Sequence, residues 1–202
     1  MGRAGVFLDR DGTIIEDVGY LDTADRLRLL PRAAEAVRLL NAAGLVTIVI
    51  SNQSGVARGY FPEERVQQVH ARLASVLAGE GARLDAIYYC PHHPDFGPPA
   101  LRVACDCRKP RTGMIERGAA EFGLDAARCY VVGDKGTDVA CARRAGAIGV
   151  LVHGGGGVEP PAKEPVAADH EAADLFEAAS WIVSRERGQG VPHGGRNTAC
   201  KT

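Results

Sequence analysis

The stretch Val6–Ile15, which reads VFLDRDGTII, joins a short apolar run to two carboxylates that stand two positions apart. Buried carboxylates are costly in a core, so Asp9 and Asp11 are expected at the end of a strand, where open α/β sheets bind ligands. Gly12 allows the chain to turn sharply after them. Mg²⁺ binds one or two carboxylates together with phosphate oxygens, and an aspartate can accept a phosphoryl group. Asp9 is therefore a candidate nucleophile and Asp11 a candidate general acid/base, although an isolated Asp-x-Asp is more often a solvated turn.

The bulk properties indicate one globular domain in a reducing compartment. The chain has 202 residues and a formal net charge of -1, which gives no electrostatic reason to expect nucleic acid or an anionic membrane as a partner. No apolar run approaches the roughly 20 residues that span a bilayer, and the charges at 9–11 leave no room for a signal peptide. We expect a cytoplasmic protein whose six cysteines are metal ligands or inert thiols, not disulfides.

Apolar runs alternate with segments of helical period along most of the chain. Strands are expected at residues 6–8, 45–50, 86–89, 129–132 and 147–152, and helices at 31–43, 62–79, 112–122, 137–145 and 171–185. This alternation predicts an α/β fold with a parallel sheet and helices on both faces. We expect one domain over residues 1–187, with a flexible connection at 154–161 and a disordered tail at 188–202.

Polar residues also follow the second and third predicted strands. Residues 51–55, which read SNQSG, supply a hydroxyl and amides that can bind a phosphoryl oxygen. Lys109 can neutralise the charge that develops on a transferring phosphoryl group, and the planar guanidinium of Arg108 suits a second phosphate or sugar hydroxyls. Taken singly, residues 51–55 are more often a polar turn, and an Arg-Lys pair is more often a solvated basic pair.

The fourth predicted strand ends at another carboxylate. Asp134 follows the run Val131–Gly133 and is well placed as a third carboxylate for a metal. Lys135 can pair with Asp134 or contact a substrate, whereas Asp138 is expected to cap or brace the following helix. Four strand ends in succession thus carry groups suited to phosphoryl chemistry.

In this order, the four motifs resemble those of the haloacid dehalogenase superfamily of phosphotransferases, over about residues 5 to 152. The resemblance implies a Rossmann-like sheet. It also implies that Asp9 is the nucleophile, that Asp11 is the general acid/base, and that Ser51 and Lys109 stabilise the phosphoryl group. Mg²⁺ would be held by Asp9, the backbone carbonyl of Asp11 and Asp134.

Cysteine and histidine residues frame the loop at 90–107. Cys90, His92, Cys105 and Cys107 offer three thiolates and one imidazole, which is a closed tetrahedral set for Zn²⁺. The segment between them has little apolar content with which to fold itself, so a structural metal would organise it. His93 is an alternative ligand to His92, and four unrelated residues are the remaining alternative.

The spacing of the motifs leaves no room for a cap domain between residues 11 and 51, and the zinc loop takes the second place where a cap could be inserted. Two capless branches of the superfamily carry such a loop, the histidinol-phosphate phosphatases and the D-glycero-D-manno-heptose 1,7-bisphosphate 7-phosphatases. The stretches FLDRDGTI, SNQSGVARG, YYCPHHP, CDCRKP and VVGDK resemble the heptose branch. A histidinol-phosphate or broadly selective sugar phosphatase is the alternative enzyme, and a zinc-stabilised phosphate-binding module is the alternative without catalysis.

The resemblance to the heptose branch implies hydrolysis of the C7 phosphate through an aspartyl-phosphate, which would supply heptose 1-phosphate for nucleotide-activated heptose synthesis. The partner that the resemblance implies for this protein is a small sugar bisphosphate, and we expect the protein to be a monomer. The implied substrate contacts are Asp17, Val18, Gly19, Tyr20, Asn52, Gln53, Ser54, Arg108 and Lys135.

Overall fold

The computed structural model describes residues 2–153 and 167–189. The predicted flexible connection at 154–161 lies outside this part, and so do residues 190–202 of the predicted tail. Within the described ranges, no helix is long and apolar enough to cross a membrane.

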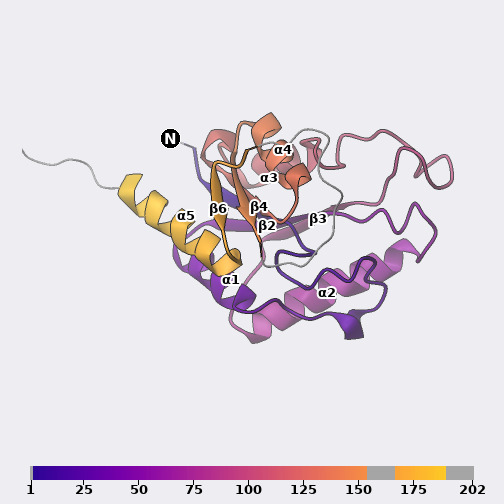
Figure 1. The fold of residues 1–202 in the computed structure, drawn as a ribbon, viewed down its shortest axis with the longest axis horizontal. Helices are drawn as coiled ribbons and strands as arrows, with labels where there is room; N and C mark the ends of the chain where they lie inside the picture. Colours follow the sequence, from indigo (N-terminus) through magenta and orange to yellow (C-terminus); the bar gives the residue numbers. More distant parts are fainter. Residues whose placement is uncertain (1, 154–166, 190–202) are drawn as a thin grey trace, which may run out of the picture.

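Six parallel strands form one sheet in the order β3-β2-β1-β4-β5-β6 (Figure 1). The strands are β1 (Gly5–Leu8), β2 (Val46–Asn52), β3 (Ala86–Cys90), β4 (Tyr130–Gly133), β5 (Ile148–Val152) and β6 (His170–Ala172). Leu8 of the central strand β1 pairs with Val49 on one side and Val132 on the other. The carboxyl ends of β1, β2 and β4, where the predicted motifs lie, therefore meet at one edge of the sheet.

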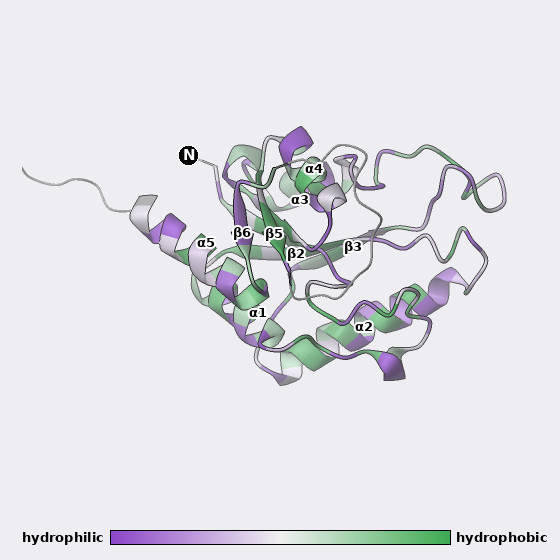
Figure 2. Ribbon diagram, in the orientation of Figure 1, coloured by the Kyte–Doolittle hydropathy of each residue, from purple (hydrophilic) through white to green (hydrophobic). Residues whose placement is uncertain are grey.

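Helices cover both faces of the sheet, as predicted. The helices are α1 (Ala33–Ala42), α2 (Glu63–Gly79), α3 (Gly113–Phe122), α4 (Gly136–Ala145) and α5 (Leu175–Gln189). One apolar core joins Val6 and Leu8 to α1, α2 and α5, and a second joins Phe7 to α3 and α4. Figure 1 shows the two helical layers on opposite sides of the strands, and Figure 2 shows the apolar strands between them. Successive side chains of β1 enter the two cores in turn, so this strand is buried on both faces.

The predicted last helix is wrong at both ends. Residues 170–172 form the edge strand β6, and α5 runs from Leu175 to Gln189, so the first two residues of the predicted tail are helical. His170 and Glu171 carry no apolar signal, and the strand exists because Val150, Leu151 and Val152 of β5 pair with it. Asp174 then starts the helix, since its carboxylate accepts a hydrogen bond from the backbone N–H of Glu177 at 2.8 Å.

The connections at the carboxyl edge are loops, which confirms the predicted absence of a cap domain. Residues 9–32 contain only one short 3₁₀ turn, η1 (Ala24–Arg26), before α1 begins. Residues 91–112 contain no helix or strand and include the predicted zinc loop. Access to the carboxyl edge is therefore shaped by these two loops.

Candidate active site

A polar cavity of about 270 Å³ opens at the carboxyl edge of the sheet. Most of the predicted site residues line it. The lining residues are Asp9, Asp11, Asp17, Gly19, Tyr20, Ser51, Asn52, Ser54, Arg108, Lys109, Lys135, Thr137 and Asp138. Val18 is exposed and does not line the cavity, and Gln53 is buried beneath it.

Lys109 lies at the centre of the cavity floor. Its Nζ is 2.5 Å from Oδ1 of Asp9 and 2.6 Å from Oδ1 of Asp138, and it donates to the carbonyl oxygen of Ile50 at 2.9 Å. Burial alone would lower the pKa of Lys109, but the carboxylates of Asp138 and Asp9 raise it overall, so the ammonium stays charged. Asn52 holds the backbone of Lys109 through two hydrogen bonds, of 3.0 and 3.1 Å.

Three carboxylates, two of them paired with this lysine, lie closely enough together to share a cation. Asp9, Asp134 and Asp138 each offer an oxygen within 4.8 Å of the others. Burial raises the pKa of Asp9 to about 7 and that of Asp134 to about 6. Oδ1 of Asp134 is buried and accepts no hydrogen bond from the described residues, although Nζ of Lys135 lies 3.8 Å from it. A buried carboxylate oxygen without a donor among several like charges is chemically suited to a hard divalent cation.

Glycine is required where the first motif approaches the fourth. Gly12 has a φ of 84°, and a Cβ there would collide with the carboxylate of Asp134. The left-handed conformation and the missing side chain together let Asp134 lie against the loop that carries Asp9 and Asp11.

The predicted role of Asp138, to cap or brace the following helix, was incomplete. Asp138 does brace the start of α4, because its Oδ2 accepts a hydrogen bond from the backbone N–H of Lys135 at 3.3 Å. Its other oxygen pairs with Lys109. The sequence alone offers no signal for this second contact, since the two residues meet only through packing of α4 against the sheet.

The carboxylate of Asp11 is held by Arg10 and Gln53. Arg10 donates to both of its oxygens, and Nε2 of Gln53 donates to Oδ2 at 2.9 Å. The same amide nitrogen donates to Oγ of Ser51 at 2.7 Å. Gln53 thus connects Asp11, the predicted general acid/base, to Ser51, which is predicted to stabilise the phosphoryl group.

The loop after β1 reaches back over the cavity. Oδ1 of Asp17 accepts a hydrogen bond from the backbone N–H of Gly19 at 2.8 Å, and Oδ2 pairs with Nζ of Lys135 at 3.0 Å. Tyr20 is 42% exposed at the rim, with its ring edge-to-face against Tyr60 at 4.6 Å between centroids. The Asp17–Lys135 pair therefore joins this loop to the end of β4.

The predicted zinc ligands converge in one cluster. The Sγ atoms of Cys90, Cys105 and Cys107 and a ring nitrogen of His92 all lie within 4.8 Å of one another. The hydrogen bond between Cys90 and Cys107 lowers the pKa of the Cys107 thiol and raises that of the Cys90 thiol, so Cys107 is the member of the pair that ionises first. His93 does not join the cluster, because its Nε2 faces Arg58 at 3.3 Å. The geometry favours His92 over His93.

The cluster of cysteines and His92 is connected to the polar cavity through Arg108. Nη1 of Arg108 donates to the carbonyl oxygen of His92 at 3.4 Å, and Arg108 lines the cavity. The fold of the cysteine loop therefore affects where the guanidinium of Arg108 lies in the cavity.

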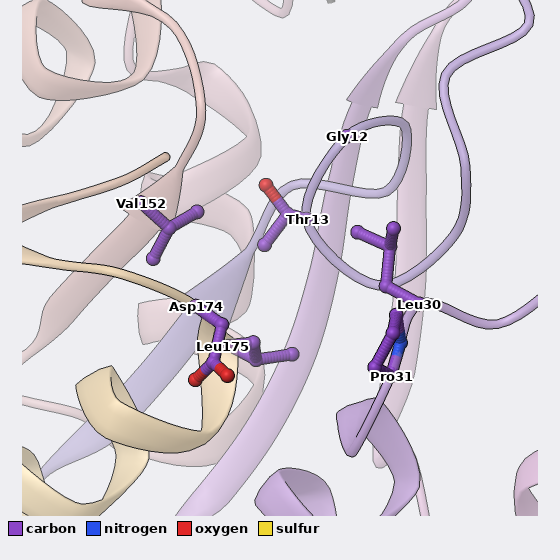
Figure 3. A pocket seen from close by; sticks show the side chains of 7 residues that line it. All are labelled: Gly12, Thr13, Leu30, Pro31, Val152, Asp174 and Leu175. Carbon is purple, nitrogen blue, oxygen red and sulfur yellow. The ribbon is translucent and has the colours of Figure 1, made fainter. Parts of the chain in front are cut away.

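A second cavity, of about 130 Å³, lies beside Gly12 (Figure 3). Its walls include Thr13, Leu30, Val152 and Asp174. The carboxylate of Asp174 already accepts the hydrogen bond that begins α5, and Leu30 and Val152 make one wall of the cavity apolar. Unlike the polar cavity, it has no cation to meet a phosphate among its lining residues.

Comparison with known proteins agrees with this geometry. A family model described as HAD-hydrolase-like matches residues 106–178. The chain is 43% identical over 194 residues to D-glycero-D-manno-heptose-1,7-bisphosphate 7-phosphatase of Thermosynechococcus vestitus, covering 91% of this chain and 97% of that protein. It is 45% identical over 152 residues to the β-heptose 7-phosphatase of Rhodopseudomonas palustris, covering 75% and 84%.

A solved structure gives the same picture. The crystal structure of D,D-heptose 1,7-bisphosphate phosphatase from B. bronchiseptica, complexed with magnesium and phosphate, matches with a TM-score of 0.77 and 30% identity. The match covers 91% of this chain and 99% of that one. Similarity thus extends over nearly the whole length of both chains.

Proposed function

The chain belongs to the D-glycero-D-manno-heptose-1,7-bisphosphate 7-phosphatase family of HAD phosphatases, and on that premise we propose that it removes the C7 phosphate from a heptose 1,7-bisphosphate. The products are heptose 1-phosphate and inorganic phosphate. The observation that carries the proposal is the buried Lys109, which is paired with both Asp9 and Asp138 on the floor of a polar cavity.

The residues present fit the magnesium ion that this family of phosphatases uses. We propose that Asp9, Asp134 and the backbone carbonyl of Asp11 hold it, since Oδ1 of Asp134 is buried without a donor and the carboxylates are close together. When bound, Mg²⁺ supplies positive charge that neutralises phosphate oxygens. Asp138 would keep its ion pair with Lys109 and would not bind the metal.

In the proposed reaction Asp9 is the nucleophile. Lys109 holds Oδ1 of Asp9, which leaves Oδ2 to attack phosphorus in line with the leaving sugar oxygen. The new O–P bond forms as the C7 oxygen departs, and Lys109 and Ser51 stabilise the charge on the phosphoryl oxygens. The result is an aspartyl-phosphate on Asp9.

Asp11 moves the protons of both steps. It gives its proton to the departing C7 oxygen, and it then takes a proton from the water that attacks the aspartyl-phosphate. Phosphate leaves, Asp9 is restored as a carboxylate, and Asp11 is again protonated. Atoms and charges balance over the cycle with water as the only co-reactant.

The rim of the cavity supplies candidate contacts for the remainder of the substrate. Arg108 and Lys135 bring positive charge that suits the second phosphate, and Tyr20 offers an exposed ring against the sugar. Asp17, Gly19, Asn52 and Ser54 supply hydrogen-bonding groups. Val18 and Gln53 would act indirectly, through the loop and through Asp11.

We further propose that the cluster of Cys90, His92, Cys105 and Cys107 holds a structural Zn²⁺, because four converging S and N donors form a closed site. Free thiols of this kind are maintained in a reducing compartment, which supports a cytoplasmic location. We also propose that the protein acts as a monomer.

The position of cleavage tests the proposal directly. The purified protein is incubated with Mg²⁺ and heptose 1,7-bisphosphate, and the phosphorus NMR spectrum is followed. Loss of the C7 resonance with retention of the C1 resonance is expected. Loss of the C1 phosphate, or equal loss of both, would contradict the proposed function.

A further inference from the structure

Arg10 stands between Asp9 and Asp11, yet its side chain is only 1% exposed. A guanidinium stays charged at any accessible pH, so burying it is tolerated only where acceptors surround it. Nε donates to Oδ2 of Asp11 at 3.1 Å and Nη2 donates to Oδ1 at 2.9 Å. Nη1 lies 3.0 Å from Nε2 of His70.

His70 contacts Arg10 from α2. It lies on the buried face of α2, and its ring is edge-on to that of Tyr89, with 5.2 Å between the centroids. The hydroxyl of Tyr89 in turn donates to Glu63 at 2.8 Å. The imidazole is therefore held in place by its packing as well as by its hydrogen bond.

The chemistry of the contact fixes the protonation state of His70. An arginine N–H can only donate, so Nε2 of His70 is the acceptor and the ring proton lies on Nδ1. Burial lowers the pKa of His70 to about 3, and the charge of Arg10 acts in the same direction. A neutral imidazole is thus dedicated to orienting the guanidinium.

The guanidinium has a specific effect on Asp11. Each carboxylate oxygen has two lone-pair sites. Oδ2 accepts from both Arg10 and Gln53, so its sites are filled, whereas Oδ1 accepts one hydrogen bond from Arg10. Oδ1 is therefore the oxygen with room for a proton.

We propose that Arg10 and His70 are positioning residues for this reaction: His70 fixes the guanidinium, and the guanidinium fixes Asp11 so that Oδ1 carries the transferred proton. This inference deepens the proposed function and rests on the proposed role of Asp11. Neither residue touches the substrate, and both act through Asp11.

The test compares two variants on two leaving groups. His70→Phe keeps a ring against Tyr89 but removes the acceptor, and His70→Gln keeps an acceptor. A sugar phosphate needs a proton on its leaving oxygen, whereas 4-nitrophenyl phosphate needs little help. We expect His70→Phe to lower kcat/KM by about 10- to 100-fold on the sugar phosphate and by less than about threefold on the aryl ester. His70→Gln should recover most of the loss.

Equal losses on the two substrates, or equal damage from Phe and Gln, would overturn the proposal, because a general structural role predicts both. If the wild-type protein does not act on heptose bisphosphate, the proposed substrate fails, and the same comparison proceeds with whichever alkyl phosphate it hydrolyses. Nitrogen-15 NMR of wild-type His70 is a readout that does not depend on activity. A neutral ring protonated at Nδ1 is expected from about pH 5 to 8, and a charged ring or one protonated at Nε2 would overturn the proposal.

Discussion

Replacing His70 by glutamine should make the protein more tolerant of acid. The pKa of His70 is lowered from 6.5 to about 3 in the folded protein, first by burial and then by Arg10. Below about pH 6.5 the unfolded chain binds a proton at this residue and the folded chain does not, so stability falls as the pH falls. At about pH 5 the penalty is about 1.5 pKa units, or about 2 kcal/mol of unfolding free energy.

Glutamine removes this titration while it retains an acceptor for Arg10. Urea unfolding of both proteins at about pH 7 and about pH 5 measures the effect. The wild-type protein should lose about 2 kcal/mol more than His70→Gln between the two conditions. If both proteins lost the same free energy, His70 would not be held neutral by its surroundings, and the reasoning would be refuted.

Three further changes test the site. Asp9→Asn should reduce phosphate release by at least about 10³-fold in a protein that still folds, because the amide oxygen can still accept from Lys109, and activity near wild type would exclude Asp9 as the nucleophile. Asp138→Ala leaves Lys109 with one buried carboxylate, so chemical denaturation should show a loss of about 3–5 kcal/mol; a loss below about 1 kcal/mol would mean that Asp9 alone suffices. Cys105→Ser should abolish bound zinc in elemental analysis and lower the Tm, whereas an unchanged Tm in zinc-free protein would argue against a structural metal.

Much of the sheet was predictable because its strands are buried on both faces. The runs that became β1, β2, β4 and β5 are apolar and continuous, and each ends at a polar residue or glycine. The strand β6 was missed because His170 and Glu171 lie at the edge of the sheet, where pairing with β5 and not local composition decides the structure.

The site was predictable where chemistry demands a residue type at a strand end. Asp9, Ser51 and Asp134 converge because the carboxyl ends of parallel strands meet. Lys109 reaches the same place from the loop at 91–112, where Asn52 holds its backbone. Contacts from helices were not predictable in this way. His70 lies in the middle of an amphipathic helix with nothing in its neighbours to mark it.

Side-chain direction was the other limit. Ser51, Asn52 and Ser54 line the cavity, whereas Gln53 is buried and donates to Asp11 and Ser51. The sequence SNQS supplies the right groups, but which of them faces a substrate depends on the register of β2 in the sheet.

The most direct test of the central claim is substrate discrimination. Phosphate release with Mg²⁺ is measured for both anomers of heptose 1,7-bisphosphate, for histidinol phosphate and for fructose 1,6-bisphosphate. We predict a kcat/KM for one heptose anomer at least about 100-fold above the two other substrates, which is about 2.7 kcal/mol of transition-state discrimination. Comparable rates on all of these substrates, or a preference for histidinol phosphate, would contradict the assignment.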